Sequence, residues 1–353
     1  TITITENESA PVITLATSTA SVAENSLAIG DLPNALFAII ATSSQVTNED
    51  ITVTLSTSGS ATDGTDYTVA SGSSNNGNGS LGGQTITISA GATTGTITGT
   101  PTDDSIYEDD EVATIAISDV SGGGATESGT QSVSITITEN ETAPTITLAT
   151  STASVAENSG TTITLTATAS QVADEDIIVT LSTSGIATNG TDYTSVNSTT
   201  ITILAGSTTE TKSFAPTDDS VYEGDEATSV SISSVSGGGA TESGTQSVSI
   251  TITEDESIPT ITMSASQTSA AENSGTEVTL TLTTSQIADE DIVVSLSASG
   301  TISSSDYVST SLSPSTITIS AGSTTGTVSA TPSDDSIYEG DESLTVSISS
   351  VSG

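Results

Sequence analysis

The chain repeats itself three times. Residues 120–139 and 235–254 are identical and read VSGGGATESGTQSVSITITE. An acidic motif that begins at Asp103 recurs at Asp218 and Asp334, at intervals of about 115 residues, the size of an ordinary small domain. We therefore expect a tandem array. The predicted units are 1–10, the last strand and linker of a preceding repeat; 11–143, the first repeat; 144–258, the second repeat; and 259–353, the third repeat without its last strand.

Each repeat has the period of a β-strand. Apolar residues alternate with Thr and Ser in stretches such as 161–167 (TTITLTA) and 248–253 (VSITIT). A period of two rich in β-branched residues predicts half-buried strands. About seven short strands per repeat predict an all-β fold of tandem antiparallel immunoglobulin-like β-sandwiches. The linkers are short and end at Pro144 and Pro259, so they should be stiff and the sandwiches should form an elongated rod.

Two insertions distinguish the first repeat. The first insertion, 27–42, is the most apolar and least repeat-like stretch. It is a candidate contact surface for a glycan or a protein receptor, and the alternative is that it covers an edge strand. The second insertion, 71–83, is rich in Gly, Asn and Ser and is typical of a loop. The six tyrosines all lie in repeated motifs, and we expect them to be packing residues.

The composition excludes several functions. The chain has 44 Asp and Glu, one Lys, and no Arg, His or Cys, for a formal net charge of −43. Such a chain should not bind nucleic acid, and its longest apolar run is too short for membrane insertion. Catalytic triads and thiolate or imidazole zinc sites are excluded by the missing His and Cys. An enzyme with paired carboxylates is not expected either, because sugar-stacking aromatics are scarce and one catalytic site would not be copied three times.

The carboxylates recur at four separate points of each repeat. In the second repeat these points are Glu157 in AEN, Asp192 in GTDY, the acidic motif 218–226, and the linker 254–256. Asp218 is expected at the end of one strand and Glu223 at the start of the next, so that all four points converge at one end of the sandwich. Carboxylates gathered there would repel one another without counter-ions.

A hard cation would resolve this repulsion, and calcium, with six to eight oxygen ligands in flexible geometry, fits better than magnesium. The alternative is that the acids are solvated turn residues that confer solubility. A solvated turn is also the interpretation favoured for three acidic triplets that precede a strand: 48–50, 174–176 and 289–291.

These motifs together resemble a known family. The run AENSG…GTDY…DDSVYEGDE…SITITE is similar to the Calx-β domain, and the resemblance covers almost the whole chain three times. It implies several calcium ions per repeat at one pole of the sandwich, between loops and the tail of the last strand. The implied ligands of the first repeat are Glu24, Asp66, Asp103, Asp104, Glu108, Glu111, Glu139 and Glu141. Those of the second repeat are Glu157, Asp192, Asp218, Asp219, Glu223, Glu226, Glu254 and Glu256, and those of the third are Glu272, Asp306, Asp334, Asp335, Glu339 and Glu342.

The chain departs from the family pattern in three places. Asp109 stands where the other repeats have Gly224 and Gly340, residues 304–305 are Ser-Ser where the others have Gly-Thr, and the first linker, 139–141, is Glu-Asn-Glu rather than a run of aspartates. These departures bear on the number of ions at each site more than on their presence.

The favoured function is a calcium-binding structural region of an extracellular surface protein, adhesin or fibre, in which calcium at the inter-domain junctions stiffens the rod. Its partners would be neighbouring repeats or subunits of the same protein, end to end. One alternative is a filament subunit, in which Thr1–Thr5 completes the third repeat of the next copy by donor-strand exchange and Glu6 and Glu8 complete its calcium pole. The simpler alternative is that the sequence is a window of a longer array. A third alternative is a calcium-dependent module that binds a glycan or a protein.

Overall fold

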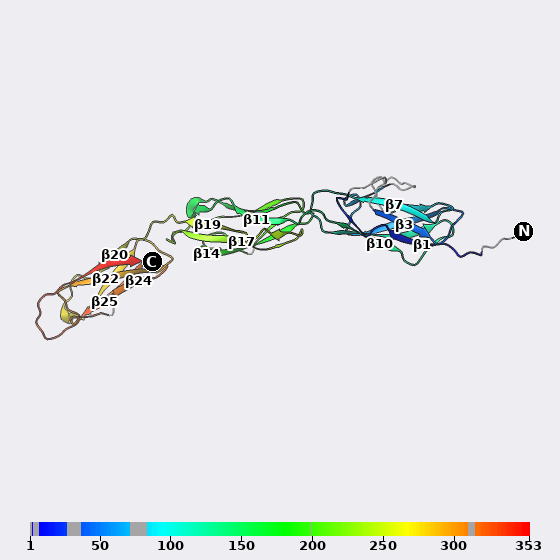
Figure 1. Ribbon diagram of the computed structural model, residues 1–353. Helices are drawn as coiled ribbons and strands as arrows, with labels where there is room; N and C mark the ends of the chain where they lie inside the picture. The colour runs from blue at the N-terminus through cyan, green and yellow to red at the C-terminus, as the bar shows by residue number, and fades with distance from the viewer. Residues whose placement is uncertain (1, 3–6, 27–36, 71–82, 198, 310–314) are drawn as a thin grey trace.

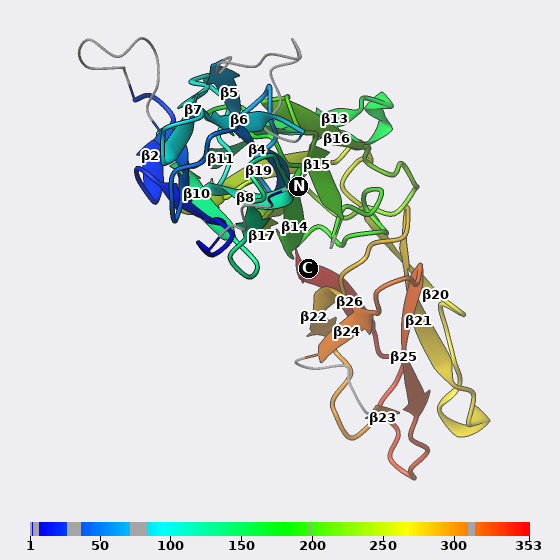
Figure 2. The same cartoon turned by 90° about the vertical axis from the view of Figure 1, so that its right-hand side faces the viewer.

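The computed structural model describes residues 2, 7–26, 37–70, 83–197, 199–309 and 315–353. Three β-sandwiches follow one another along an elongated rod, as Figure 1 shows. Figure 2 looks along the first two sandwiches and shows the third one turned away from them. The prediction of tandem antiparallel β-sandwiches in a rod is therefore confirmed. No helix among the described residues is long and apolar enough to cross a membrane.

The first sandwich consists of two five-stranded sheets, with the orders β5-β7-β3-β1-β9 and β2-β10-β8-β4-β6. Its strands are β1 (Val12–Thr17), β2 (Ser21–Ala23), β3 (Phe37–Ser43), β4 (Ile51–Gly59), β5 (Tyr67–Ala70), β6 (Thr85–Ile88), β7 (Thr94–Pro101), β8 (Glu111–Ser121), β9 (Thr126–Glu127) and β10 (Ser132–Thr138). Both insertions of this repeat lie largely outside the described residues. The described end of the first insertion is β3, which lies between β1 and β7 in the sheet centre, so this part does not cover an edge strand.

The second sandwich repeats this plan with sheets β16-β13-β11-β18 and β12-β19-β17-β14-β15. Its elements are β11 (Thr145–Thr150), β12 (Ser154–Ala156), the 3-10 helix η1 (Glu157–Ser159), β13 (Ile163–Ala169), β14 (Ile177–Gly185), β15 (Thr200–Ile203), β16 (Thr209–Phe214), β17 (Glu226–Ser236), β18 (Thr241–Glu242) and β19 (Ser247–Thr253).

The third sandwich has sheets β20-β21-β25-β23 and β24-β22-β26 among its described residues. Its elements are β20 (Ile261–Ala265), the 3-10 helix η2 (Glu272–Ser274), β21 (Val278–Thr284), β22 (Ile292–Gly300), β23 (Tyr307–Ser309), β24 (Ser315–Ile319), β25 (Thr325–Pro332) and β26 (Leu344–Ser352). Its buried cluster is much smaller than those of the other two sandwiches.

The alternation of the sequence sets the two faces of each sheet. In β13, Ile163, Leu165 and Ala167 are fully buried, while the Thr residues between them are only partly covered. The first two sandwiches contain more strands than the seven expected per repeat, in part because their first strand is split between the sheets and in part because each has an additional two-residue strand, β9 or β18. For example, β11 pairs antiparallel with β13, whereas β12 pairs parallel with β19 in the opposite sheet. Thr150 and Thr152 donate side-chain hydrogen bonds to backbone carbonyls at the crossing, which stabilises the bend.

The acidic motif mostly occupies a loop rather than strand ends, which corrects the sequence-based expectation. β16 ends at Phe214, four residues before Asp218, and β17 begins only at Glu226. The backbone N–H groups of this loop donate to carboxylates instead of to a neighbouring strand: Asp219 donates to Glu157 and Glu223 donates to Glu254. The loop therefore cannot extend the sheet, and it projects at the end of the sandwich.

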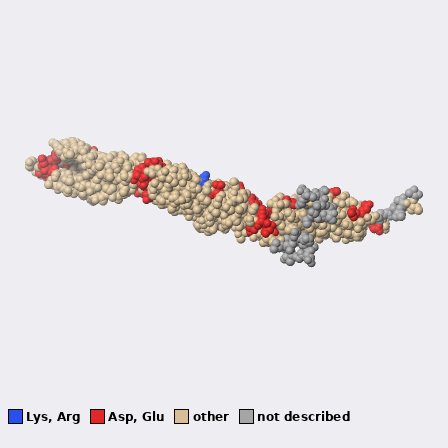
Figure 3. Space-filling view, turned by 90° about the horizontal axis from the view of Figure 1, so that it is seen from above, with Lys and Arg blue, Asp and Glu red and all other residues tan. Residues whose placement is uncertain are grey.

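Acidic residues gather at the ends of the sandwiches, as Figure 3 shows, and the long sides carry few charges. We call the end that holds the acidic motif the pole of each sandwich, and the opposite end its base. The poles of the first and second sandwiches face the bases of the second and third, so the densest negative charge lies at the two junctions.

Candidate metal centres at the sandwich poles

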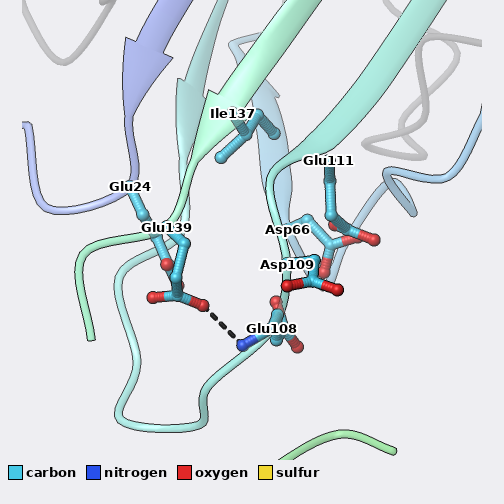
Figure 4. Close-up of a pocket in the computed structure, with 7 residues that line it drawn as sticks. All are labelled: Glu24, Asp66, Glu108, Asp109, Glu111, Ile137 and Glu139. Atoms are coloured by element: carbon cyan, nitrogen blue, oxygen red, sulfur yellow. Dashed lines mark hydrogen bonds between the residues drawn. The ribbon is translucent and has the colours of Figure 1, made fainter. Parts of the chain in front are cut away.

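Four segments that are distant in sequence meet at the pole of the first sandwich. Glu24 follows β2, Asp66 precedes β5, Glu108 lies in the loop between β7 and β8, and Glu139 follows β10. The ends of β2, β7 and β10 and the starts of β5 and β8 lie at the same end of the sandwich, so the segments that carry these acids are adjacent. Figure 4 shows their carboxylates pointing toward one another.

The carboxylates form two adjacent groups. The first group, which we call the loop cluster, consists of Asp66, Glu108 and Glu111, and the second, the linker cluster, consists of Glu24, Glu139 and Glu141. Within each group one oxygen per residue lies within 4.8 Å of the others.

A cavity of about 10 Å³ lies between the two groups and is lined by acids of both, as Figure 4 shows. This is close to the smallest volume that holds a single water or ion.

These acids are buried without a counter-charge. Glu24 is 6% exposed and Asp66 is 7% exposed. Burial, followed by the negative charge of Glu139, raises the pKa of Glu24 to about 7. Burial, followed by a hydrogen bond with Asp66, raises the pKa of Glu111 to about 8, and one oxygen of Glu111 is enclosed without a partner. The single Lys of the chain, Lys212, lies on β16 and belongs to neither cluster.

The second pole repeats this arrangement. Its loop cluster consists of Asp192, Glu223 and Glu226, and its linker cluster consists of Glu157, Glu254, Asp255 and Glu256. Asp192 is 7% exposed and Glu157 is 4% exposed. Burial, followed by the charge of Asp192, raises the pKa of Glu223 to about 7, and burial with a hydrogen bond to Asp192 raises that of Glu226 to about 8. Sequence analysis did not place Asp255 among the ligands, although its position beside Glu254 and Glu256 in the linker could have indicated it.

The third pole is more open. Its loop cluster consists of Asp306, Glu339 and Glu342, and the two glutamates are exposed. No linker cluster is found there among the described residues. The backbone N–H of Asp335 donates to Glu272, at 3.3 Å, as its counterparts do at the other two poles.

The double aspartates of the acidic motif lie outside these clusters. The second one shapes the loop, because its carboxylate accepts a backbone N–H two residues ahead in each repeat: Asp104 from Ile106, Asp219 from Val221 and Asp335 from Ile337. Of the first ones, Asp103 accepts a weak bond from the Asn140 side chain, at 3.4 Å, while Asp218 and Asp334 are exposed. Glu8 is exposed and joins no cluster, and Glu6 lies outside the described residues.

The acidic triplets at the bases have two separate roles. Their last residue fixes a neighbouring turn, because Asp50, Asp176 and Asp291 accept backbone N–H groups from Ala90, Ala205 and Ala321. Their first residue is exposed, as a solvated turn would be, but in the second and third triplets it lies beside the preceding pole. This neighbour of Asp174 and Asp289 was not predicted from the sequence.

Comparison with known proteins gives the family of the chain. The Calx-beta domain matches it three times, over residues 6–141, 139–257 and 254–353. Among solved structures, it is similar to the crystal structure of CBD12 from CALX1.2, at 15% identity and a TM-score of 0.25, over 61% of this chain and 77% of that one. It is also similar to the crystal structure of the apo form of the Calx CBD1 domain, at 20% identity and a TM-score of 0.28, over 32% and 99%.

A third similar structure is that of the Yersinia pseudotuberculosis adhesin InvE, at 13% identity and a TM-score of 0.30, over 68% and 58% of the two chains. None of the curated proteins matches the sequence. Since the family matches cover nearly the whole chain, the chain belongs to the Calx-beta domain family, of which it carries three consecutive copies.

Proposed function

We propose that this chain is a calcium-binding structural region of an extracellular surface protein, adhesin or fibre. The observation that carries the proposal is the buried, unpaired negative charge at both junctions. Glu24, Asp66, Glu157 and Asp192 are each more than nine-tenths buried. Each accepts a backbone N–H, but the charged side chains in their clusters are all carboxylates, so no positive charge balances them. Burying one charge without a partner is costly, and burying several together is more so.

The residues present fit calcium. Every available ligand atom is an oxygen, which excludes the softer metals that prefer thiolate or imidazole. Enclosed oxygens of Glu111 and Glu256 have no hydrogen-bond donor, so they are free to coordinate a cation. A bound calcium ion would supply the positive charge that the buried carboxylates lack, and its irregular, high coordination number suits three or four acids from separate loops better than the octahedron of magnesium.

The clusters indicate how many ions each pole would hold. In the first two sandwiches the loop cluster and the linker cluster would each hold an ion, while in the third the loop cluster would hold one. Seven further acids lie next to these groups and would serve as additional ligands or as negative charges just outside the site. They are Asp103, Asp104, Asp218, Asp219, Asp334, Asp335 and Glu272.

Calcium at these poles would stiffen the rod. The linker acids Glu139, Glu141, Glu254 and Glu256 belong both to the clusters and to the segments that join the sandwiches. An ion held by them therefore fixes the linker against the pole of the preceding sandwich. Sites of this kind suit the calcium concentrations found outside cells, where extracellular modules bind with dissociation constants of about 10⁻⁴ to 10⁻³ M.

A thermal melt tests the proposal. The chain is melted with excess EGTA and then with calcium or magnesium added back, and a large rise in melting temperature specific to calcium is expected, because a ligand that binds only the folded state stabilises it. Small-angle scattering under the same conditions should show a narrower distribution of lengths with calcium. Equal melting curves in EGTA and in calcium would contradict the proposal.

The donor-strand alternative has one supporting observation. A groove of about 490 Å³ in the third sandwich is lined by apolar residues that include Met263, Leu280 and Leu344. A strand such as β10 or β19 would fit along β26 there. The proposed donor, Thr1–Thr5, lies outside the described residues except for Ile2, which is 95% exposed. Deleting residues 1–8 should abolish polymers, and polymers that persist would contradict this alternative.

A further inference from the structure

The two junctions share one backbone connection. The Tyr107 N–H donates to the Val172 carbonyl, at 2.9 Å, and the Asp174 N–H donates back to the Tyr107 carbonyl, at 3.1 Å. At the second junction Tyr222 bonds in the same way to Ile287, at 2.9 Å, and to Asp289, at 3.2 Å. The loop that carries the acidic motif of one sandwich is thus bonded directly to the first residue of the acidic triplet of the next.

The ring of Tyr107 fixes the same contact from the other side. It packs on Gly239, where a Cβ atom would lie only 2.4 Å from the ring and where the backbone has a φ of +58°. Neither the space nor the backbone conformation tolerates a larger residue at this position. The contact therefore holds the base of the second sandwich at a defined place against the first pole.

This placement brings a carboxylate of the next sandwich to the loop cluster. At the first junction the backbone bond places residue 174 beside Tyr107, the neighbour in sequence of Glu108 in the loop cluster. At the second junction, Glu223 and Asp289 line a common cavity of about 420 Å³. The negative charge of Asp174 or Asp289 thus adds to three acids that already lack a counter-charge.

We propose that Asp174 and Asp289 bind the cation held by the loop cluster of the preceding sandwich, so that each site is completed across a junction. The proposal rests on the proposed function. A second observation points to a ligand in the same place: one oxygen of Glu111 is enclosed beside Asp66 and Glu108 and has no hydrogen-bond partner. Each ion would then bind two sandwiches at once, and docking of the next sandwich would strengthen calcium binding at the pole before it.

The chain contains its own comparison for this role. The first triplet has Asn48 in the position of Asp174 and Asp289, and it directly precedes β4 of the first sandwich. The adjacent acid, Glu175, is exposed and lies outside the clusters, as Asp174 does. It carries the same charge as Asp174, but the backbone bond to Tyr107 is made by Asp174.

Calorimetric calcium titration of the full chain tests the proposal, with Asp174→Asn and Asp174→Asn/Asp289→Asn as variants and Glu175→Gln as the control. Asp174→Asn should weaken calcium binding at one site about tenfold, because affinity follows the number of charged ligands, and the double variant should weaken two sites. Small-angle scattering in calcium should show a wider spread of lengths for both variants. Glu175→Gln should match the wild type, and melting curves in EGTA report that all variants are folded.

Two outcomes would contradict the proposal that Asp174 and Asp289 bind the cation. If the wild-type chain binds no calcium, the proposed function fails and this inference fails with it. If the wild type binds calcium but Asp174→Asn and Glu175→Gln titrate alike, Asp174 acts only as a distant charge, and the inference fails while the proposed function stands.

Discussion

The second and third poles carry almost the same acidic motif in different surroundings. DDSVYEGDE at the second pole and DDSIYEGDE at the third differ by one methylene group. At the second pole Asp192 is buried, both glutamates of the loop cluster are half-buried, and Asp289 of the next sandwich lines a common cavity with Glu223. At the third pole both glutamates are exposed, and Tyr338 is 96% exposed where Tyr222 is half-buried.

The difference separates what the motif determines from what its neighbours determine. The local loop is the same, because Asp219 and Asp335 accept the same N–H two residues ahead, at 2.7 and 2.6 Å. The burial of the acids, in contrast, comes from the linker after β19 and from the base of the next sandwich. A cation should therefore bind more tightly at the second pole than at the third.

Removal of calcium should cause the largest difference in stability between the second sandwich and the third. Calcium at about one hundred times its dissociation constant stabilises a domain by about 2.7 kcal/mol, which corresponds to a rise of roughly 10–20 °C in melting temperature for a domain of this size. The first two sandwiches should show this rise and the third a smaller one. Hydrogen exchange resolved by peptide measures the three separately. Equal protection of all three by calcium would show that docking and linker acids add nothing.

A pair of matched substitutions should give the next largest effect. Glu226→Gln and Glu342→Gln remove the same carboxylate from the second and third loop clusters. In calcium titrations, Glu226→Gln should weaken its site about tenfold and Glu342→Gln its own site by a smaller factor, because the charge of a ligand counts for more where water is excluded.

The same pair should differ in the opposite sense without metal. In EGTA at about pH 9, above the pKa of about 8 of Glu226, Glu226→Gln should raise the melting temperature by a few degrees, since it removes a buried negative charge beside Asp192, while Glu342→Gln should leave it unchanged. A loss of stability for Glu226→Gln in EGTA would mean that its carboxylate is satisfied by the protein alone.

The pH dependence of the metal-free chain should be opposite to ordinary acid denaturation. The pKa of Glu226 is about 8 and that of Glu223 about 7 in the folded chain, against 4.5 in the unfolded chain. The folded state therefore binds more protons, and stability is highest below about pH 4.5 for these groups and falls as pH rises through 7 to 8. Melts in EGTA should show several degrees of loss between pH 5.5 and 8.5 for the second sandwich, and less for the third. A melting temperature that does not change with pH would show that these carboxylates are solvent-exposed.

With saturating calcium the sign should reverse, because protons compete with the ion for the same oxygens. The melting temperature of the second sandwich should then rise with pH over the same range. A fall with pH in both conditions would indicate that calcium does not reach the carboxylates that titrate.

The sequence predicted the strands and the gathering of acids well, because both depend on local patterns repeated three times. Period-two alternation determined which face of β13 is buried, and the positions of Glu24, Asp66 and Glu139 next to strand ends were enough to bring them to one pole. The prediction missed Asp174 and Asp289, because their proximity to the preceding pole depends on how one sandwich is rotated against the next, and no local pattern records that rotation.

The prediction that all tyrosines are packing residues had the same limit. Tyr67 and Tyr193 are 1% exposed, as expected for core residues, but Tyr107 and Tyr222 pack against the next sandwich and Tyr338 is exposed. Tyr107, Tyr222 and Tyr338 occupy the same position of the acidic motif. The role of each ring therefore depends on whether the base of another sandwich lies against it.

Substitution of these tyrosines should give the smallest but most specific effect. Tyr222→Ala removes a ring that packs against the third sandwich and leaves the backbone bonds to Ile287 and Asp289 in place. The melting temperature should change by only a few degrees, since the ring is half-buried, but the angle between the second and third sandwiches should become more variable in small-angle scattering. Tyr338→Ala is the matched control, because its ring is exposed, and it should change neither measurement. If the two variants scatter alike in calcium, the bound ion and the linker hold the junction without the ring. If only Tyr222→Ala broadens the distribution, and does so even with calcium, the junction needs both the packed ring and the shared ion to be rigid.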